Sequence, residues 1–202
     1  VIAALDAVDG EVVVEGWVTK TGVSIAERMK QLSGYVGGFL VTFVEREGRM
    51  KGTDMGRVAE LVGLAGDARL TIAGGVTTAA ELATLHHMGV DAQVGMALYT
   101  GRLPLGEAVA APLRSDRPDG LWPTVVVDPQ GVALGLCWSN QESLSTALAD
   151  GQGVYWSRKR GLWRKGETSG STQELLSVDL DCDADALRFT VRQAGRGFCH
   201  LH

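Results

Sequence analysis

Hydrophobic and polar positions along residues 1–110 follow two alternating patterns. Short apolar runs bounded by glycine predict four strands, and segments with apolar residues at three- and four-residue spacing predict three helices. The strands are expected at residues 1–5, 37–44, 69–75 and 91–98, and the helices at residues 24–35, 54–66 and 79–89. This alternation predicts parallel strands with right-handed crossovers. Four strand–helix units make half of a (β/α)8 barrel, so an α/β half-barrel is the expected fold.

The pattern changes after residue 110. Residues 111–123 have prolines around charged residues and no periodicity, which predicts a linker. Residues 124–138 have the pattern of a hairpin that turns at residues 128–131. A helix is expected over residues 140–151, with Asn140 as its N-cap and Gly151 as its stop. The remaining residues are strand-like and rich in charge, so residues 124–202 are expected to form a small α+β domain.

Composition narrows the class of protein. The 202 residues are 45% hydrophobic and 21% charged, which is ordinary for a soluble globular protein. A net charge of −5 argues against a general nucleic-acid binder, and no apolar stretch approaches the ~20 residues of a membrane-spanning helix. Three cysteines do not predict a disulfide framework, and the first ten residues lack the basic region of a signal peptide. We therefore expect a cytoplasmic enzyme with no nucleic-acid or membrane partner.

The two ends of the chain indicate a window cut from a longer polypeptide. Val1 already lies inside an expected strand, and His202 closely follows a Cys-His pair.

The stretch DLDCDADALRF, residues 179–189, carries the clearest candidate chemistry. It places Asp181, Asp183 and Asp185 at alternate positions, with Cys182 between the first two. This period predicts a strand with its acids on one face and the cysteine on the other. Three carboxylates repel one another unless a cation neutralises them, and oxygen ligands suit Mg²⁺ whereas a soft thiolate suits zinc. The alternative is a solvated edge strand whose acids are simply exposed.

Four motifs in residues 1–110 carry a resemblance. They are ALDAVDGEVVVEGW (4–17), LVTFVEREGRMKGTD (40–54), TIAGGVTT (71–78) and VGMALYTGRLPL (94–105). In this order they resemble the second half of the ProFAR isomerase barrel of histidine biosynthesis. The resemblance implies that Asp6 is one of two acid/base aspartates of an aldose–ketose rearrangement, with Thr42 as a substrate contact. The residues expected to bind phosphate after the last two strands are Gly74, Gly75, Gly95 and Met96.

Alternatives to this isomerase interpretation remain. An aspartate after a strand is commonly a turn or helix cap, and Glu47 stands where the family more often has aspartate. The first half of the barrel and its catalytic aspartate are missing from these residues, so the segment is not expected to isomerise a substrate unaided.

Two long motifs near the C-terminus carry a second resemblance. YWSRKRGLWRKGETSGSTQ (155–173) and DLDCDADALRFTVRQAGRGFCH (179–200) resemble phosphoribosyl-AMP cyclohydrolase over residues 119–202. The resemblance implies that Asp181, Asp183 and Asp185 hold Mg²⁺, and that Cys182 and Cys199 hold a zinc ion shared across a homodimer. His200 is then a candidate proton carrier. The expected contacts with the phosphorylated substrate are Arg158, Arg160, Lys165, Glu167, Thr168 and Ser169.

Other residues have plainer interpretations. Trp156 and Trp163 either stack on a purine or belong to the core, and the basic run around Arg158 is otherwise a solvated face. Cys137 matches no ligand position and is expected to be a buried structural thiol. His86 and His87 are expected to be exposed on a helix.

The two resemblances describe consecutive steps, because the cyclohydrolase product is the isomerase substrate. The sequence therefore predicts a multifunctional histidine-biosynthesis enzyme whose recognisable activity is zinc-dependent hydrolysis. Two alternatives stay open: another metal hydrolase acting on nucleotides, and a non-catalytic half-barrel that serves as a dimerisation scaffold with structural metal sites.

Overall fold

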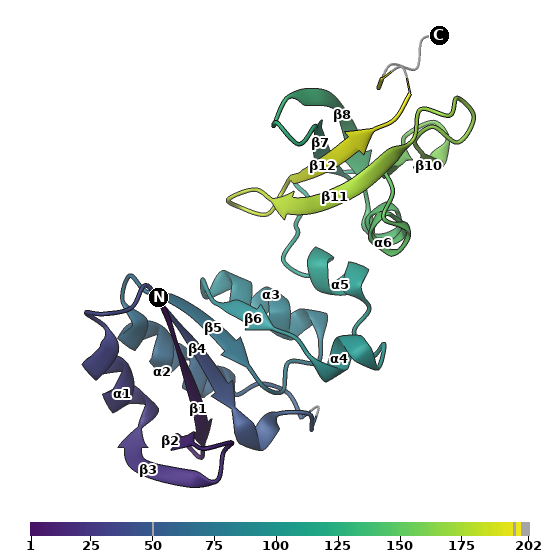
Figure 1. Ribbon diagram of the computed structural model, residues 1–202. Helices are drawn as coiled ribbons and strands as arrows, with labels where there is room; N and C mark the ends of the chain where they lie inside the picture. Colours follow the sequence, from purple (N-terminus) through teal and green to yellow (C-terminus); the bar gives the residue numbers. More distant parts are fainter. Residues whose placement is uncertain (50, 196, 199–202) are drawn as a thin grey trace. The chain divides into compact units, whose positions relative to one another are not determined.

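The chain folds as two compact units, Val1–Pro104 and Leu105–His202 (Figure 1). The computed structural model describes residues 1–49, 51–195 and 197–198. The division falls before α5 (Leu105–Ala110), earlier than the boundary expected at residue 110, because α5 packs on α6 (Gln141–Asp150). Gln141 Nε2 donates a hydrogen bond of 3.1 Å to the carbonyl of Gly106.

The first unit is built on a six-stranded sheet. The expected parallel strands are present as β1 (Ile2–Val8), β4 (Gly38–Phe43), β5 (Arg69–Ala73) and β6 (Asp91–Gln93). A hairpin that the sequence interpretation missed, β2 (Glu11–Val14) and β3 (Thr19–Ser24), adds two antiparallel strands, so the order is β3-β2-β1-β4-β5-β6.

One predicted strand was too long. Pairing of β6 with β5 ends at Gln93, and Gly95 precedes the short helix α4 (Met96–Tyr99) rather than a continuing strand. The prediction of a strand over residues 91–98 is therefore wrong in its second part, because the chain has no partner strand beyond Gln93 within the described residues.

Helices α1 (Ile25–Leu32), α2 (Met55–Ala65) and α3 (Ala79–His87) follow the expected segments, and a 3-10 turn, η1 (Val44–Arg46), precedes α2. Each α-helix begins at a polar cap whose side chain accepts a backbone N–H: Ser24 from Glu27, Asp54 from Arg57 and Thr78 from Glu81. The core lies where these helices pack on the sheet, around buried residues such as Leu5, Phe39, Val41, Met29 and Val58. The described strands form an open sheet and no closed barrel.

The second unit has a four-stranded sheet in the order β11-β12-β7-β8. Its strands are β7 (Trp122–Val127), β8 (Ala133–Ser139), β11 (Gln173–Leu180) and β12 (Leu187–Gln193), and β9 (Val154–Ser157) with β10 (Gly161–Arg164) forms a separate hairpin. The β12–β7 pair is parallel, and the other pairs are antiparallel.

Two local predictions in this unit are confirmed. The β7–β8 hairpin turns at residues 128–131, where Asp128 Oδ1 accepts the N–H groups of Gln130 and Val132. Helix α6 begins at the Asn140 cap and ends at Gly151, whose φ of 62° is left-handed.

The buried centre of the second unit contains a polar chain. Tyr155 is fully buried, and its hydroxyl donates to Gln173 Oε1 at 2.6 Å. Gln173 Nε2 in turn donates to Gln193 Oε1 at 2.8 Å. The chain satisfies buried polar groups that would otherwise destabilise the core.

Among the described helices, none has the length and apolar character needed to cross a membrane.

Gly106→Ala tests the placement of α5. A Cβ there would lie 2.1 Å from Ser145 Oγ and 2.6 Å from Ser145 Cα, so the helices must separate. We expect a loss of about 1–3 kcal/mol from the free energy of unfolding of the second unit, as in other overpacked contacts. Hydrogen exchange of the α6 amides measures this loss in the second unit, and exchange of the α3 amides gives the stability of the first unit for comparison.

Gly63→Ala is the matched control. It lies inside α2 with nothing within 4 Å of an added Cβ, so we expect a gain of ~0.5–1 kcal/mol in the first unit from helix propensity. Unchanged protection of α6 in Gly106→Ala would contradict the α5–α6 packing.

Candidate functional site

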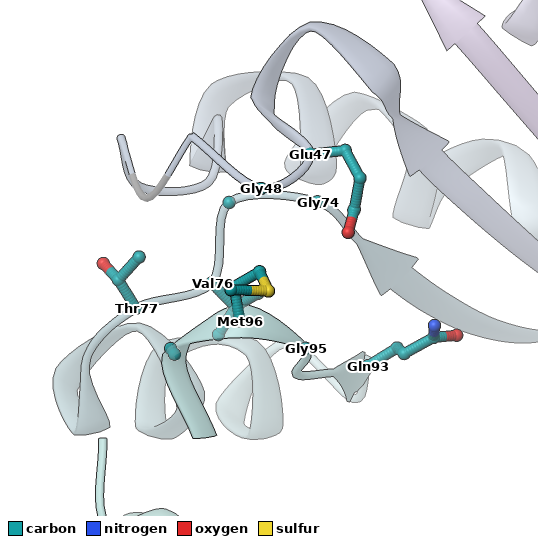
Figure 2. Close-up of a pocket in the computed structure, with 10 residues that line it drawn as sticks. Glu47, Gly48, Gly74, Val76, Thr77, Gln93, Gly95 and Met96 are labelled. Atoms are coloured by element: carbon teal, nitrogen blue, oxygen red, sulfur yellow. The ribbon is translucent and has the colours of Figure 1, made fainter. Parts of the chain in front are cut away.

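A small pocket lies where β5 and β6 end in the first unit (Figure 2). Its empty volume is about 260 Å³. The structure brings together in it the four residues expected to bind phosphate, and their role stays a prediction. The lining residues are Glu47, Gly48, Gly74, Gly75, Val76, Thr77, Gln93, Gly95, Met96 and Ala97.

Backbone geometry explains the glycine pair. Gly74 and Gly75 have φ of 92° and 90°, a region that side chains rarely adopt. An added Cβ would lie 2.5 Å from the Phe43 carbonyl oxygen at Gly74 and 2.5 Å from the Gly52 carbonyl oxygen at Gly75. The loop is therefore restricted to glycine and leaves bare backbone at the pocket.

Glu81 fixes the same loop, and the sequence interpretation missed this role. Its Oε1 accepts the Thr53 N–H at 2.7 Å, and its Oε2 accepts the N–H and hydroxyl groups of Thr77 and Thr78 at 3.0 Å each. Partial burial alone would raise the pKa of Glu81, but the hydrogen bonds from Thr53, Thr77 and Thr78 outweigh it and lower the pKa. The Thr-x-x-Glu capping box was a sequence signal for part of this network.

Asp6 and Thr42 lie in one row across the sheet. Asp6 pairs in register with Thr42, Thr42 with Ala73, and Ala73 with Gln93. Residues that pair in register present side chains to the same face, so Asp6 and Thr42 share the face opposite buried Leu5 and Ala7. Asp6 is half-buried and lies two residues before Val8, the last residue of β1, rather than at the end of the strand.

Asp6 has one side-chain partner in the described structure. The Trp17 indole N–H donates to Asp6 Oδ2 at 2.8 Å. Trp17 is in the β2–β3 turn with a positive φ of 74°.

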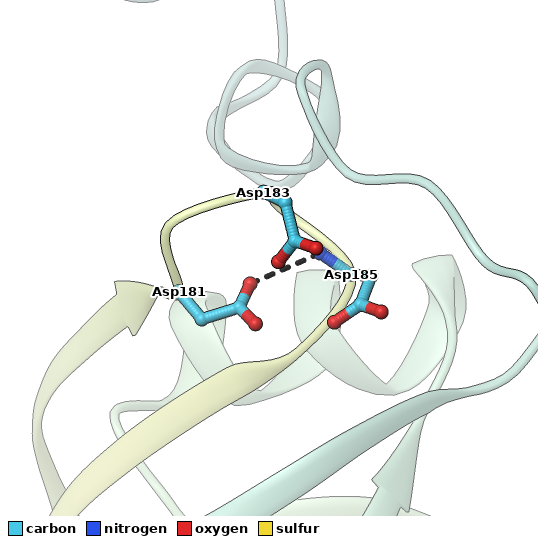
Figure 3. A group of neighbouring side chains, drawn as sticks. All are labelled: Asp181, Asp183 and Asp185. Carbon is cyan, nitrogen blue, oxygen red and sulfur yellow. Dashed lines mark hydrogen bonds between the residues drawn. The ribbon is translucent and has the colours of Figure 1, made fainter.

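The three acids of the second unit gather on a loop (Figure 3). The prediction of a strand here is wrong, because β11 ends at Leu180 and β12 begins at Leu187. Asp181 Oδ1 accepts the N–H groups of Asp185 and Ala186 at 3.0 and 3.1 Å, which closes the turn. The acids therefore share a side through the turn rather than through strand alternation, and one ligand oxygen from each lies within 4.8 Å of the others.

The pKa values of two acids in the loop shift in opposite directions. Burial would raise the pKa of Asp181, but hydrogen bonds from the backbone of Ala186 and Asp185 lower it. The negative charge of Asp183 raises the pKa of Asp185. A cation bound beside these acids would relieve the repulsion that Asp183 exerts on Asp185.

Cysteine placement differs from the strand-based expectation. Cys182 is exposed on the same loop, with its Sγ 3.9 Å from Asp183 Oδ1. Cys137 is buried as predicted, and burial raises its pKa to about 12 against a smaller lowering by Lys165. Cys199 and His200 lie outside the described residues.

A second pocket combines indole rings and cations. Its empty volume is about 900 Å³, and β8, β9, β10 and the β9–β10 turn supply its walls. The lining residues are Leu136, Cys137, Trp138, Trp156, Ser157, Arg158, Lys159, Arg160 and Trp163.

Only some of the expected substrate contacts line this pocket. Arg158 and Arg160 do, whereas Lys165 is 5% exposed and donates from Nζ to the Ser171 carbonyl at 3.3 Å. The remaining three, Glu167, Thr168 and Ser169, are exposed outside the lining. Trp138 lines the pocket although the sequence interpretation gave it no role.

Comparison with known proteins gives both units a family context. Residues 1–104 match the model of the "Histidine biosynthesis protein" family, and residues 135–202 match that of phosphoribosyl-AMP cyclohydrolase. The chain is 58% identical over 101 residues to a histidine biosynthesis trifunctional protein of Neurospora crassa, covering 50% of this chain and 12% of that protein.

Two further relatives agree. A histidine biosynthesis bifunctional protein of Schizosaccharomyces pombe is 52% identical over 100 residues, which is 50% of this chain and 24% of that protein. A phosphoribosyl-AMP cyclohydrolase of Saccharophagus degradans is 51% identical over 84 residues, which is 41% of this chain and 66% of that protein. The chain thus spans only a small part of the multifunctional relatives.

The first unit is an open βα sheet with a glycine-lined pocket, and the second unit has an acidic loop and a pocket lined by indoles and cations. The chain belongs to the histidine biosynthesis protein family, whose model covers more than half of it.

Glu81→Gln is expected to lower the free energy of unfolding of the first unit by about 1–3 kcal/mol, the range for hydrogen bonds to charged groups. Because the folded-state pKa is lowered, the stabilisation is complete above the ordinary glutamate pKa and is lost as the pH falls through the folded-state value. The difference between wild type and Glu81→Gln should therefore shrink in acid, as denaturant titrations across pH would show. Glu60→Gln, at an exposed position of α2, is the control and should show no such difference.

Alkylation should distinguish two thiols. We expect iodoacetamide at neutral pH to modify exposed Cys182 and to spare Cys137, whose raised pKa and burial suppress the thiolate. Peptide mass spectrometry before and after unfolding measures this. Rapid labelling of Cys137 in the folded protein would contradict its buried position.

Proposed function

We propose that the second unit opens the adenine ring of phosphoribosyl-AMP to give ProFAR, and that the first unit is part of the isomerase that converts ProFAR to PRFAR. The observation that carries the proposal is the pairing of an acidic, thiol-bearing loop with a cationic aromatic pocket in the unit that matches the cyclohydrolase model. Relatives named for several histidine-biosynthesis functions in one chain support joining the two activities.

The acid loop fits a divalent cation. Three carboxylates offer oxygens within 4.8 Å of one another, and the raised pKa of Asp185 reports repulsion that a cation would remove. Asp181, Asp183 and Asp185 would hold Mg²⁺. Because Asp181 already accepts two backbone N–H groups, its carboxylate is oriented before any ion arrives.

Zinc is the second proposed metal. Cys182 is exposed and free of a disulfide, so its sulfur is accessible as a ligand, and Cys199 is the proposed second thiolate. Bound zinc supplies a water whose pKa is lowered toward neutrality, which provides hydroxide for hydrolysis. His200 is the proposed proton carrier.

The pocket supplies binding and orientation. Arg158 and Arg160 would bind phosphate oxygens, and the indoles beside them offer faces to a purine. Lys165 is proposed to contribute its positive charge to phosphate binding although it does not line the pocket. Its Nζ lies 5.4 Å from the centroid of the Phe198 ring. Glu167, Thr168 and Ser169 would contact the substrate from their exposed turn.

In the first unit, Asp6 is the proposed acid or base and Thr42 a substrate contact. The Trp17 indole N–H donates to Asp6 Oδ2 at 2.8 Å and orients the carboxylate. Backbone at Gly74, Gly75 and Gly95, with Met96, would receive the phosphate of the sugar.

We also propose a homodimer in the cytoplasm. Val125 and Leu136 pair in register on neighbouring strands and are 39% and 62% exposed, which leaves an apolar area on the sheet of the second unit. Burial of this area against a second copy would bring two acid loops into one assembly.

The test measures zinc content and phosphoribosyl-AMP ring opening on the same preparations of wild type, Cys182→Ala and Asp183→Asn. We expect Cys182→Ala to lower both zinc content and turnover, the latter at least about a hundredfold, as for loss of a metal-bound nucleophile. Asp183→Asn should raise the Mg²⁺ concentration needed for half-maximal rate. Cys137→Ala is the control and should keep its zinc.

Other outcomes favour other functions. Zinc binding without ring opening would favour the scaffold with structural metals. Equal hydrolysis of AMP and phosphoribosyl-AMP would favour a general nucleotide hydrolase.

A further inference from the structure

Trp138 of β8 has two guanidinium groups over its ring. The Cζ atom of Arg117 is 4.0 Å from the centroid of the Trp138 ring, and that of Arg158 is 5.3 Å from it. Arg158 and Trp138 line the second pocket, and Arg117 does not. Trp138 and Arg158 therefore meet within the pocket, whereas Arg117 stacks on the same ring without lining the pocket.

Arg117 is held rigidly in this position. Its Nε and Nη2 donate to Asp119 Oδ1 and Oδ2 at 2.9 and 2.8 Å. Ser115 Oγ accepts the Arg117 N–H at 3.2 Å and donates to the Leu121 carbonyl at 2.8 Å, so the turn itself is organised. A bidentate pair fixes the plane of the guanidinium as well as its charge.

Arg158 has no comparable ion pair to fix its guanidinium group. It is exposed in the turn between β9 and β10, and within the described part of the chain it forms no ion pair. Arg164, by contrast, pairs with Asp150. An exposed cation–π contact is weak, so a phosphate can displace it.

The other two indoles of the pocket, Trp163 and Trp156, pack against neighbouring groups of the fold. Trp163 lies 5.9 Å from Tyr155 of the buried core and has Arg160 at 5.1 Å. Trp156 packs under the β9–β10 turn, where its Cη2 is 3.8 Å from the position of a Cβ on Gly161. Trp138 has Arg158, an exposed side chain without an ion pair in the described structure, as its neighbour in the pocket.

We propose that Trp138 is the base platform of this pocket. The indole stacks on the purine of the ligand, Arg117 with Asp119 fixes the position of the ring, and Arg158 leaves the indole to bind a phosphate. Arg117 and Asp119 are thus positioning residues, and Trp138 is a specificity-determining one. The inference rests on the proposed function, since it names the groups that recognise that substrate. A nucleotide meets both demands of the site because it has an aromatic face and an anion.

The experiment uses the full chain and three probes: AMP, adenosine and ribose 5-phosphate. Calorimetry gives the Kd of each for wild type and for the variants Trp138→Leu, Trp138→Phe, Arg158→Gln and Asp119→Asn. Arg192→Leu is the control, because Arg192 pairs with Glu174 on β12 and β11 away from the pocket.

We expect a split between the probes. Trp138→Leu should weaken AMP and adenosine about tenfold or more, the range for loss of a stacked base, and leave ribose 5-phosphate unchanged. Trp138→Phe should recover most of the loss. Arg158→Gln should weaken AMP and ribose 5-phosphate and spare adenosine, whereas Asp119→Asn should reproduce a weaker form of Trp138→Leu. Arg192→Leu should change none of the three.

Three outcomes overturn the proposal: wild type that does not bind AMP, equal weakening of AMP and ribose 5-phosphate in Trp138→Leu, or unchanged AMP binding in both Trp138→Leu and Asp119→Asn. Should Trp138→Leu not fold, Trp138→Phe and Asp119→Asn decide the matter with the same probes.

Failure of the reaction is distinguishable from failure of the platform. If no phosphoribosyl-AMP ring opens but the probes split as expected, the platform stands and the reaction is wrong. If Trp138→Leu opens the ring with unchanged KM, the platform is wrong and the reaction stands.

Discussion

Close approach of backbone segments at glycines is the constraint on which both units depend. In the first unit, Gly74 and Gly75 let the loop after β5 touch the carbonyls of Phe43 and Gly52, leaving no room for a Cβ. In the second unit, a Cβ added at Gly166 would lie 2.3 Å from backbone atoms of Ser171 and Thr172. A Cβ added at Gly153 would contact the side chain of Gln173. These contacts place the pocket loop against β4 and the β9–β10 hairpin against β11. Substitution at such positions must move backbone, which close-packed interiors resist.

The second unit contains both paired and unpaired charges. Arg117, Arg164 and Arg192 each have a carboxylate partner, whereas the pocket cation Arg158 has none in the described structure. The acid loop uses Asp181 to close its own turn and leaves Asp183 and Asp185 in mutual repulsion. Compensated charges stabilise the fold little at the surface, while uncompensated ones are sites where a ligand gains most.

Local signals in the sequence predicted what local interactions determine. Thr78 and Asn140 were identifiable as caps because the hydrogen bonds they make reach only three residues ahead. The acid stretch was assigned wrongly because Asp181 bonds to the backbone of its own loop, a competitor to strand pairing that alternation alone does not reveal. Strand β6 ended early because pairing with β5 stops at Gln93, and that depends on a distant segment.

The same distinction applies to the sites. The glycine loop and the acid triad were found from sequence, because their members are close together along the chain. Arg117 lies in a segment expected to be a linker, and its stacking on Trp138 required the tertiary structure. The Thr-x-x-Glu pattern carried a signal for the capping box of Glu81, but its bond to Thr53 reaches a distant segment and had no such signal.

The two pockets also differ in what they offer an anion. None of the described residues that line the first pocket is lysine or arginine, so backbone groups must carry any phosphate affinity there, against the carboxylate of Glu47. The second pocket offers exposed guanidinium groups, those of Arg158 and Arg160. Backbone donors are fixed before binding and bind a phosphate in one geometry, whereas flexible cations can follow a substrate whose ring opens. On the proposed reactions, the backbone donors would suit a step that moves protons on a fixed sugar, and the long exposed cations would suit a step that changes the shape of the base.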